Sequence, residues 1–233
     1  MLSQPAVRPS IRPDSIRQMP RVPSQPVGGE RNALAQSMQL MGAVMSFPRN
    51  NEIFGENEPA DYAYRVISGS VRTYKILSDG RRQVGGFYLP GDVFGLEFAD
   101  EHTLSAEAIG DTKVLVVKRT ALNALAGHNA SIAQQLFALT GRELRRVQDR
   151  ILLLIKSAQE RVAGFLLEMA ERTSEGNTID LPMSRQDIAD YLGLTIETVS
   201  RTLSALETSA AIEVSTSSRR IVLRNRAALK TCH

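Results

Sequence analysis

The most regular hydrophobic pattern in the chain lies between residues 131 and 156. Its apolar positions are spaced alternately by four and three residues, as in a helix that packs along one narrow stripe against another helix. This stripe, called the seam below, consists of Ala133, Phe137, Thr140, Leu144, Val147, Ile151 and Leu154. Charged side chains occupy the other faces, which favours pairing with a second copy of the chain over packing against the chain's own strands.

Residues 47–119 show a different pattern, typical of short β-strands. Glycine and proline breaks separate alternating stretches such as residues 64–67 and 70–74, and the β-branched run at 114–117 predicts a late strand. The Asp79-Gly80 pair predicts a hairpin over residues 77–81, because glycine supplies the left-handed turn geometry. Many short strands at close spacing indicate a sandwich, a jelly roll or a small barrel.

A third pattern begins near Ser157 and predicts a small separate domain. We expect a helix over residues 158–173, a turn at 174–177 and a short strand at 179–181. The apolar stretches 211–214 and 221–223 resemble two strands of a wing around residues 215–220. The predicted domains are therefore a tail (1–30), a β-roll (31–130), a long helix expected to pair with a second copy (131–156) and a C-terminal domain (157–233).

Residues 184–206 carry the signals of two helices joined by a sharp turn. Ser184 and Asp187 form a start similar to a capping box, Gly193 permits the turn, and Thr195 can cap the second helix. Val199, Leu203 and Leu206 share one face of that helix and are expected to point inward. The segment therefore predicts a helix-turn-helix.

Three polar residues, Glu197, Ser200 and Arg201, share the outward face of the second helix. Arginine can donate two hydrogen bonds to a guanine, glutamate can accept one from a cytosine amino group, and a hydroxyl can reach several base edges. The alternative is a helical hairpin that only packs, with Glu197 and Arg201 forming an ordinary surface pair. Small Ala189, together with the glycine and the caps at matching positions, favours base reading in DNA.

Other polar residues of this domain are candidates for phosphate contact, which adds affinity without sequence choice. The predicted set is Ser184, Arg185, Gln186, Thr195, Thr198, Ser218 and Arg219. For the wing residues, the alternative is a solvated hairpin tip.

Composition narrows the class of protein. The 233 residues carry a net charge of +3, with 42% hydrophobic and 23% charged residues, which is ordinary for a soluble protein. Six of the ten prolines fall in residues 1–30, which predicts a disordered or loosely attached arm, with a nucleic-acid or partner-binding arm as the alternative. The sequence shows no apolar run of membrane-spanning length and no signal peptide, so we expect no membrane partner and a cytoplasmic location.

These features together resemble the CRP/FNR family of bacterial transcription regulators. The β-region resemblance rests on Gly69 and residues 90–95 (PGDVFG), and the DNA-binding resemblance on residues 185–188, Gly193 and residues 197–201 (ETVSR). Glutamate, serine and arginine in the second helix look like the FixK and FNR branch. The implied fold is α+β: an N-terminal β-roll (jelly roll) of the cyclic-nucleotide-binding type, a long dimerisation helix and a C-terminal winged helix-turn-helix.

The resemblance also implies a mode of action. It implies a homodimer bound to a palindromic DNA operator of the TTGA…TCAA type and activation through contact with RNA polymerase. Residues 78–82 and 174–177 are the candidate polymerase contacts. It implies a transcription regulator and not an enzyme.

The expected ligand chemistry differs from that of the family's cyclic-nucleotide members. Gly95 and Glu97 are present, but no Lys or Arg lies between Leu96 and Thr112 to neutralise a phosphate. Residues 1–60 hold no cysteine for an iron–sulfur cluster; Cys232 is the single cysteine. We therefore expect no cofactor and no metal. The alternatives are a regulator gated by haem, a gas or another small molecule, and more remotely a metal-dependent β-roll enzyme.

Overall fold

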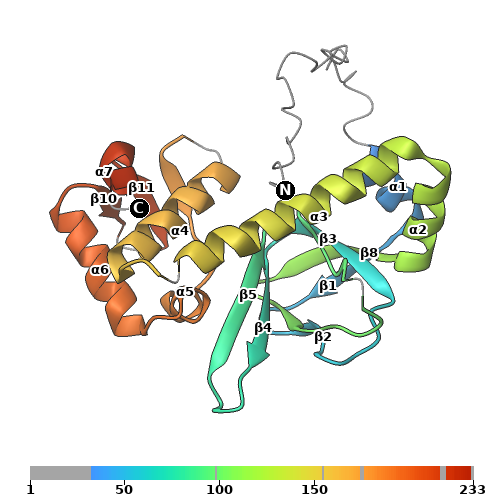
Figure 1. Ribbon diagram of the computed structural model, residues 1–233, viewed down its shortest axis with the longest axis horizontal. Helices are drawn as coiled ribbons and strands as arrows, with labels where there is room; N and C mark the ends of the chain where they lie inside the picture. The colour runs from blue at the N-terminus through green and yellow to red at the C-terminus, as the bar shows by residue number, and fades with distance from the viewer. Residues whose placement is uncertain (1–32, 98, 154, 174–175, 216–218, 232–233) are drawn as a thin grey trace, which may run out of the picture.

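The computed structural model describes residues 33–97, 99–153, 155–173, 176–215 and 219–231. The predicted tail (1–30), Leu154, Ser218 and Cys232 lie outside these ranges. Figure 1 shows a β-sandwich and a smaller C-terminal part, with one long helix that runs along the sandwich and ends where the C-terminal part begins. Among the described residues, no helix is long and apolar enough to cross a membrane.

The sandwich consists of two four-stranded sheets, as the strand pattern predicted. One sheet has the order β1-β8-β3-β6, with bounds Ala43–Phe47, Thr112–Lys118, Tyr62–Ser68 and Val93–Phe94. The other has the order β2-β7-β4-β5, with bounds Glu52–Phe54, Ser105–Ala108, Val71–Ile76 and Arg82–Tyr88. Phe54, Tyr64 and Phe94 fill the space between the sheets because inward positions alternate along each strand.

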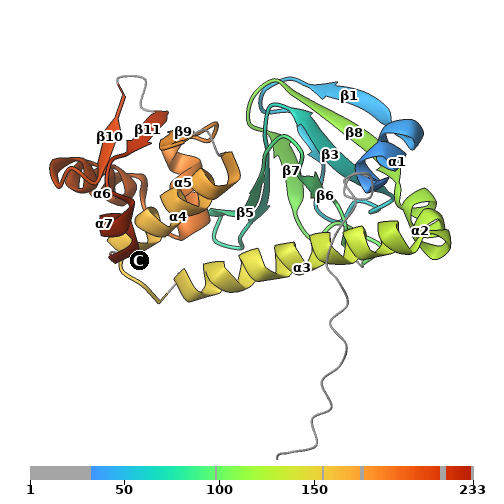
Figure 2. The ribbon, with the colours of Figure 1, turned by 90° about the horizontal axis from the view of Figure 1, so that it is seen from above.

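The predicted hairpin joins β4 to β5. Ile76 pairs with Arg82, and the Leu77 amide donates to the Arg81 carbonyl at 2.8 Å. Gly80 has φ +82°, so the turn needs the left-handed conformation that glycine adopts without strain. This hairpin projects from the sandwich towards the C-terminal part (Figure 2).

Three elements of the sandwich part lie outside the strand and helix patterns of the sequence. These are α1 (Ala33–Met41), α2 (Arg119–His128) and β1, which begins at Ala43, before the predicted strand region. Met38 and Leu122 pack with Leu115 on the outer face of a sheet. Such short helices are stabilised mainly by tertiary packing, so their own sequences carry little signal.

The long helix α3 (Ala130–Leu153) has two apolar faces. Ile132, with Leu136 and Leu139, packs on the sandwich, whereas the seam faces away from it. The prediction that the helix reaches residue 156 is wrong. Ser157 and Glu160 form reciprocal hydrogen bonds that start the next helix, and this capping interrupts the continuous helix.

The described residues of the C-terminal part form four helices and a small antiparallel sheet of order β10-β11-β9. The elements are α4 (Ala158–Thr173), β9 (Thr178–Asp180), α5 (Arg185–Leu192), α6 (Ile196–Thr208), β10 (Ile212–Val214), β11 (Arg220–Leu223) and α7 (Arg226–Thr231). The predicted helix 158–173, the helix-turn-helix and the wing strands are confirmed.

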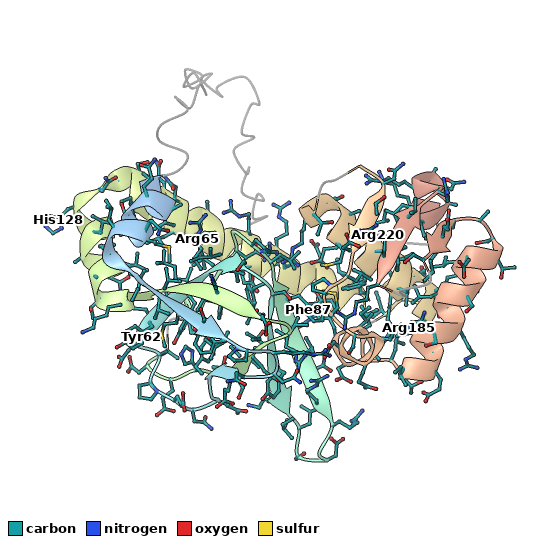
Figure 3. The ribbon with its side chains drawn as sticks, turned by 180° about the vertical axis from the view of Figure 1, so that it is seen from behind. Tyr62, Arg65, Phe87, His128, Arg185 and Arg220 are labelled. Atoms are coloured by element: carbon teal, nitrogen blue, oxygen red, sulfur yellow. The ribbon has the colours of Figure 1, made fainter. Side chains whose placement is uncertain are left out.

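The core of the C-terminal part is not closed on itself. Val84 and Phe87 of β5 belong to the same buried cluster as Phe165 and Leu206. Figure 3 shows Phe87 at the junction between the two parts. The predicted division of the chain into domains stays a prediction, but β5 is packed against both parts.

Candidate DNA-binding interface

Local hydrogen bonds build the helix-turn-helix as its sequence predicts. The Ser184 hydroxyl accepts from the Asp187 amide at 3.1 Å, and the Asp187 carboxylate accepts from the Ser184 amide at 3.0 Å. Gly193 ends α5 in the left-handed conformation, with φ 64° and ψ 41°. Thr195 then caps α6 by accepting from the Thr198 amide at 3.2 Å. The ends of both helices are therefore defined within about a dozen residues.

One face of α6 is completely covered by its own chain. Val199, Leu203 and Leu206 are at most 4% exposed, and Ala189 of α5, which is 0% exposed, allows the two helices to approach closely. The opposite face is left free of the core. Helix α6 is thus held from behind and presents its other side to solvent.

Glu197 and Arg201 lie on that solvent face and are exposed. Among the ion pairs of the described residues, none joins Glu197 to Arg201. The alternative in which Glu197 and Arg201 form a surface ion pair therefore does not describe this structure. Hydrogen bonds from its own backbone amide and from the Thr195 hydroxyl hold the pKa of Glu197 below its usual value, and the charge of Arg201 adds to this. The side chain is an anionic acceptor at neutral pH.

Ser200 is half-buried and is tied to α5. The Arg185 Nη1 donates to the Ser200 hydroxyl at 3.2 Å. The Arg185 Nε is buried and has no hydrogen-bond partner. Figure 3 places Arg185 between the two helices. A residue predicted to contact phosphate therefore touches a residue predicted to read bases.

The remaining helix residues of the predicted phosphate set lie near the starts of α5 and α6. The Gln186 amide donates to Asp190 at 2.6 Å, and the Thr195 and Thr198 hydroxyls are 3.1 Å apart. Ser184, Gln186 and Thr195 are exposed, and Thr198 is half-buried. The helix starts also carry the unpaired amides that favour anions.

In the wing, the arginines differ in how far they are already paired. Arg220 forms an ion pair with Asp180 at 3.0 Å, and Arg224 forms one with Glu213. Arg219 is exposed, and no ion pair among the described residues involves it. Arg219 is thus the wing cation that remains available to a phosphate.

The seam of α3 runs along the outside of the molecule. Phe137 is 82% exposed, Leu144 58% and Ile151 57%. Val147 is 38% exposed, and Thr140 is half-buried with its hydroxyl donating to the Leu136 carbonyl. Four large apolar side chains on one helical stripe are therefore left without cover by the described part of the chain.

A pocket of about 300 Å³ lies beside residues 95–97, between the sandwich and α3. Arg142 and Arg146 of α3 line it together with Glu97 and Glu143. The expectation that this region has no cation is therefore wrong, since it considered only the segment near Glu97. Arg146 is paired with Glu143 at 3.2 Å and with Asp92 at 3.5 Å.

The two histidines of the folded part do not form a metal site. His102 is 1% exposed and stacks on Phe54, with ring centroids 3.6 Å apart; its Nδ1 lies 3.3 Å from Glu97. His128 is exposed at the end of α2. Within the described part of the chain, no cluster of three or more potential metal ligands occurs.

Comparisons with known proteins match both parts. Residues 44–129 match the cyclic nucleotide-binding domain model, and residues 160–232 match the Crp-like helix-turn-helix domain model. The nitrogen fixation regulation protein FixK of Azorhizobium caulinodans is 48% identical over 202 residues, covering 84% of this chain and 81% of FixK. FixK of Bradyrhizobium diazoefficiens is 41% identical over 184 residues, covering 77% and 78%.

The comparison with solved structures also finds a FixK protein similar to this chain. FixK2 from Bradyrhizobium japonicum has a TM-score of 0.79 at 53% identity, covering 82% of this chain and 97% of FixK2. A CooA mutant from Carboxydothermus hydrogenoformans has a TM-score of 0.71 at 21% identity, covering 84% of this chain and 89% of that one. The similarity to CooA concerns the fold alone, whereas the similarity to FixK and FixK2 extends to the sequence.

Proposed function

Because the chain belongs to the FixK-like branch of the CRP/FNR family of DNA-binding transcription regulators, we propose that it binds an inverted DNA repeat as a homodimer. The expected repeat is of the TTGA…TCAA type. The observation that carries the proposal is the free outer face of α6, where Glu197 and Arg201 are exposed on a helix whose other face is buried.

In this proposal, α6 enters the major groove and its first turns read the bases. Arg201 donates two hydrogen bonds to a guanine, and Glu197 accepts from a cytosine amino group. The lowered pKa of Glu197 keeps its carboxylate able to accept. Arg185 holds Ser200 in place and extends the same surface towards the phosphates, where Ser184, Gln186, Thr195, Thr198, Ser218 and Arg219 are the proposed contacts.

The second copy is brought in by the seam. Two seams packed together bury Phe137, Leu144, Val147 and Ile151, and burial of apolar area is worth about 25 cal/mol per Å². A twofold dimer then presents two copies of α6 to half-sites about 34 Å apart, one turn of DNA. The twofold symmetry explains why the repeat is expected to be inverted, and the separation of the two helices sets its half-site spacing.

We further propose that the bound dimer activates transcription through RNA polymerase. The tip of the β4–β5 hairpin supports this role, because Asp79 and Arg81 there are exposed. The other proposed contact is the turn at residues 174–177, of which Gly176 and Asn177 are described. Arg82 is removed from the proposed contact, because it is paired with two acids of α5.

We propose that DNA binding needs no cyclic nucleotide. The acids Glu97 and Glu143 in the pocket disfavour a cyclic phosphate, and Arg146 is already paired. One observation favours a second candidate, a regulator gated by another small molecule. This observation is the pocket itself, of about 300 Å³ between the sandwich and α3.

Selection of preferred DNA from a random pool, with purified untreated protein, tests the proposal. We expect enrichment of an inverted repeat with identical half-sites. Enrichment of a single unrepeated site contradicts the dimer, and no preference over scrambled DNA contradicts base reading. If enrichment appears only after a small molecule is added, the gated regulator is the correct candidate. A parallel thermal-shift series with cyclic AMP, haem and carboxylates identifies its class.

A further inference from the structure

An ion-pair network connects the sandwich to the helix-turn-helix. Arg72 of β4 and Arg82 of β5 face Asp187 and Asp190 of α5; these four residues are called the clamp below. The Arg82 Nη2 lies 2.6 Å from Asp187 and 2.7 Å from Asp190, and the Arg72 Nη1 lies 3.3 Å from Asp187. Gln83 adds a hydrogen bond to the Asp190 carbonyl at 2.6 Å.

The centre of the clamp is buried. Asp187 is 3% exposed and Arg72 is 7% exposed, and Arg72 also pairs with Glu107 at 2.9 Å. Buried charges attract each other strongly only in a defined geometry, and removing one partner leaves the other uncompensated. A clamp of this kind resists rotation of one part against the other more than an apolar contact does.

The apolar contact beside the clamp constrains the relative orientation of the two parts less strongly than the ion pairs do. Phe87 packs against Tyr191 with ring centroids 5.2 Å apart and against Phe165 with centroids 6.2 Å apart. Helix α3 leads into α4 through only four residues, 154–157. The directional contacts across this junction therefore come from the clamp and from Arg172 of α4, whose Nη2 donates to the Phe87 carbonyl at 2.6 Å and pairs with Asp92 at 2.7 Å.

Both acids of the clamp also act within the helix-turn-helix. Asp187 completes the cap of α5, and Asp190 accepts from Gln186, one of the proposed phosphate contacts. The same carboxylates that order the DNA-binding end of α5 are thus held by arginines of the sandwich. Since α5 packs directly on α6, fixing α5 fixes α6.

From this geometry we propose that Arg72 and Arg82 are positioning residues for DNA recognition. They set the angle of α6 relative to α3, and through the seam they set the separation of the two α6 helices in the dimer. The proposal rests on the proposed function, because it assumes a dimer on an inverted repeat. Its consequence is that the clamp determines which half-site spacing the dimer accepts.

The first test measures binding of Arg82→Gln to repeats of different spacing. One inserted base pair rotates a half-site by about 35° and moves it by about 3.4 Å. We expect the wild-type protein to prefer one spacing by about tenfold or more, equivalent to about 1.4 kcal/mol. Arg82→Gln should lose most of that preference and keep its base preferences within each half-site.

The matched control is Arg81→Gln on the same hairpin. Arg81 is exposed, and its ion pair among the described residues is with Asp79, two residues away, so its loss should leave the spacing preference unchanged. Unchanged spacing preference in Arg82→Gln overturns the proposal. An equal loss at all spacings, with a weaker salt dependence, also overturns it, because that result identifies Arg82 as a phosphate contact.

The second test needs no DNA and separates the clamp from the proposed function. Spin labels at exposed Ser204 of α6 and exposed Asp61 of the sandwich, in a Cys232→Ser background, report the distance between the two parts. Labelled protein is diluted with unlabelled protein, so that only distances within one chain are measured. We expect a narrow distribution in the parent and a broad one in Arg72→Gln and Arg82→Gln.

A narrow distribution in both variants overturns the clamp, whatever the DNA result. Broadening together with an absence of any preferred repeat instead contradicts the proposed function alone. Circular dichroism of each variant shows whether the helices remain folded. Arg82→Gln is the milder variant, because Arg82 lies nearer the surface than Arg72.

Discussion

Helices α6 and α3 are both amphipathic, but they satisfy their apolar faces in different ways. The apolar face of α6 is closed by its own chain, with Leu206 only 1% exposed. The seam of α3 is open, with Phe137 82% exposed. The difference indicates that the apolar face of α6 is covered within one copy, whereas the described residues leave the seam of α3 uncovered, as the proposed dimer requires.

The largest expected effect comes from placing a charge in the seam. Ile151→Lys would bury an ammonium group in each copy of the dimer, which costs several kcal/mol. We expect the dimer dissociation constant to rise by about a thousandfold, since about 4 kcal/mol corresponds to that ratio. Sedimentation at several concentrations measures it. Asp149→Lys, on the exposed side of the same helix, is the control. A dimeric Ile151→Lys protein would contradict the seam.

The next largest effect distinguishes the covered face of α6 from the exposed seam of α3. Leu206→Ala removes a buried side chain, so we expect a loss of about 2–5 kcal/mol in the free energy of unfolding at any protein concentration. Leu144→Ala should lower the stability only through the dimer, so its effect should depend on concentration. Denaturant unfolding at two concentrations measures both. A concentration-independent loss for Leu144→Ala would show that the chain covers this side chain by itself.

A smaller effect concerns the reading face. Arg201→Ala should cost about 1–3 kcal/mol in binding at one guanine and relax base choice there. Binding to single-base variants of the operator measures this loss. Because Arg201 is exposed, the thermal stability of the Arg201→Ala protein should match that of the parent protein. An equal weakening on every sequence would instead identify Arg201 as a phosphate contact.

The smallest expected effect concerns the cap at the start of α5 in the helix-turn-helix. Ser184→Ala removes the acceptor for the Asp187 amide and should cost about 1 kcal/mol of stability. Thermal unfolding measures it, and Ser184→Thr should retain most of the stability. The dimer dissociation constant should not change, because Ser184 forms its hydrogen bonds with Asp187 of α5 and not with the seam of α3. A weakened dimer would show that the helix-turn-helix and the seam of α3 are less independent than their packing indicates.

Much of the DNA-binding part could be predicted from the sequence because its signals are local. The capping box at Ser184 and Asp187, the left-handed Gly193 and the Thr195 cap each depend on residues within a few positions. The hairpin around Gly80 is similar. The heptad pattern predicted the long helix, although the Ser157–Glu160 cap ends it earlier than the apolar residues suggested.

Other features depend on residues that the sequence does not bring together. The short helix α1 and strand β1 exist because Met38 and Leu115 pack on each other. The cations of the pocket beside Glu97 come from α3, more than forty residues further along the chain. No pattern near Glu97 could show them.

The sequence by itself determined the helix-turn-helix, the caps at the ends of its helices and the polar face of α6, since hydrogen bonds over three or four residues and apolar periodicity are written in consecutive positions. Only the tertiary structure decided how the two parts meet. Arg82 and Asp187 are 105 residues apart, and neither residue type is unusual where it stands. Their pairing arises because folding buries Asp187, which is 3% exposed, and a buried carboxylate requires a cation.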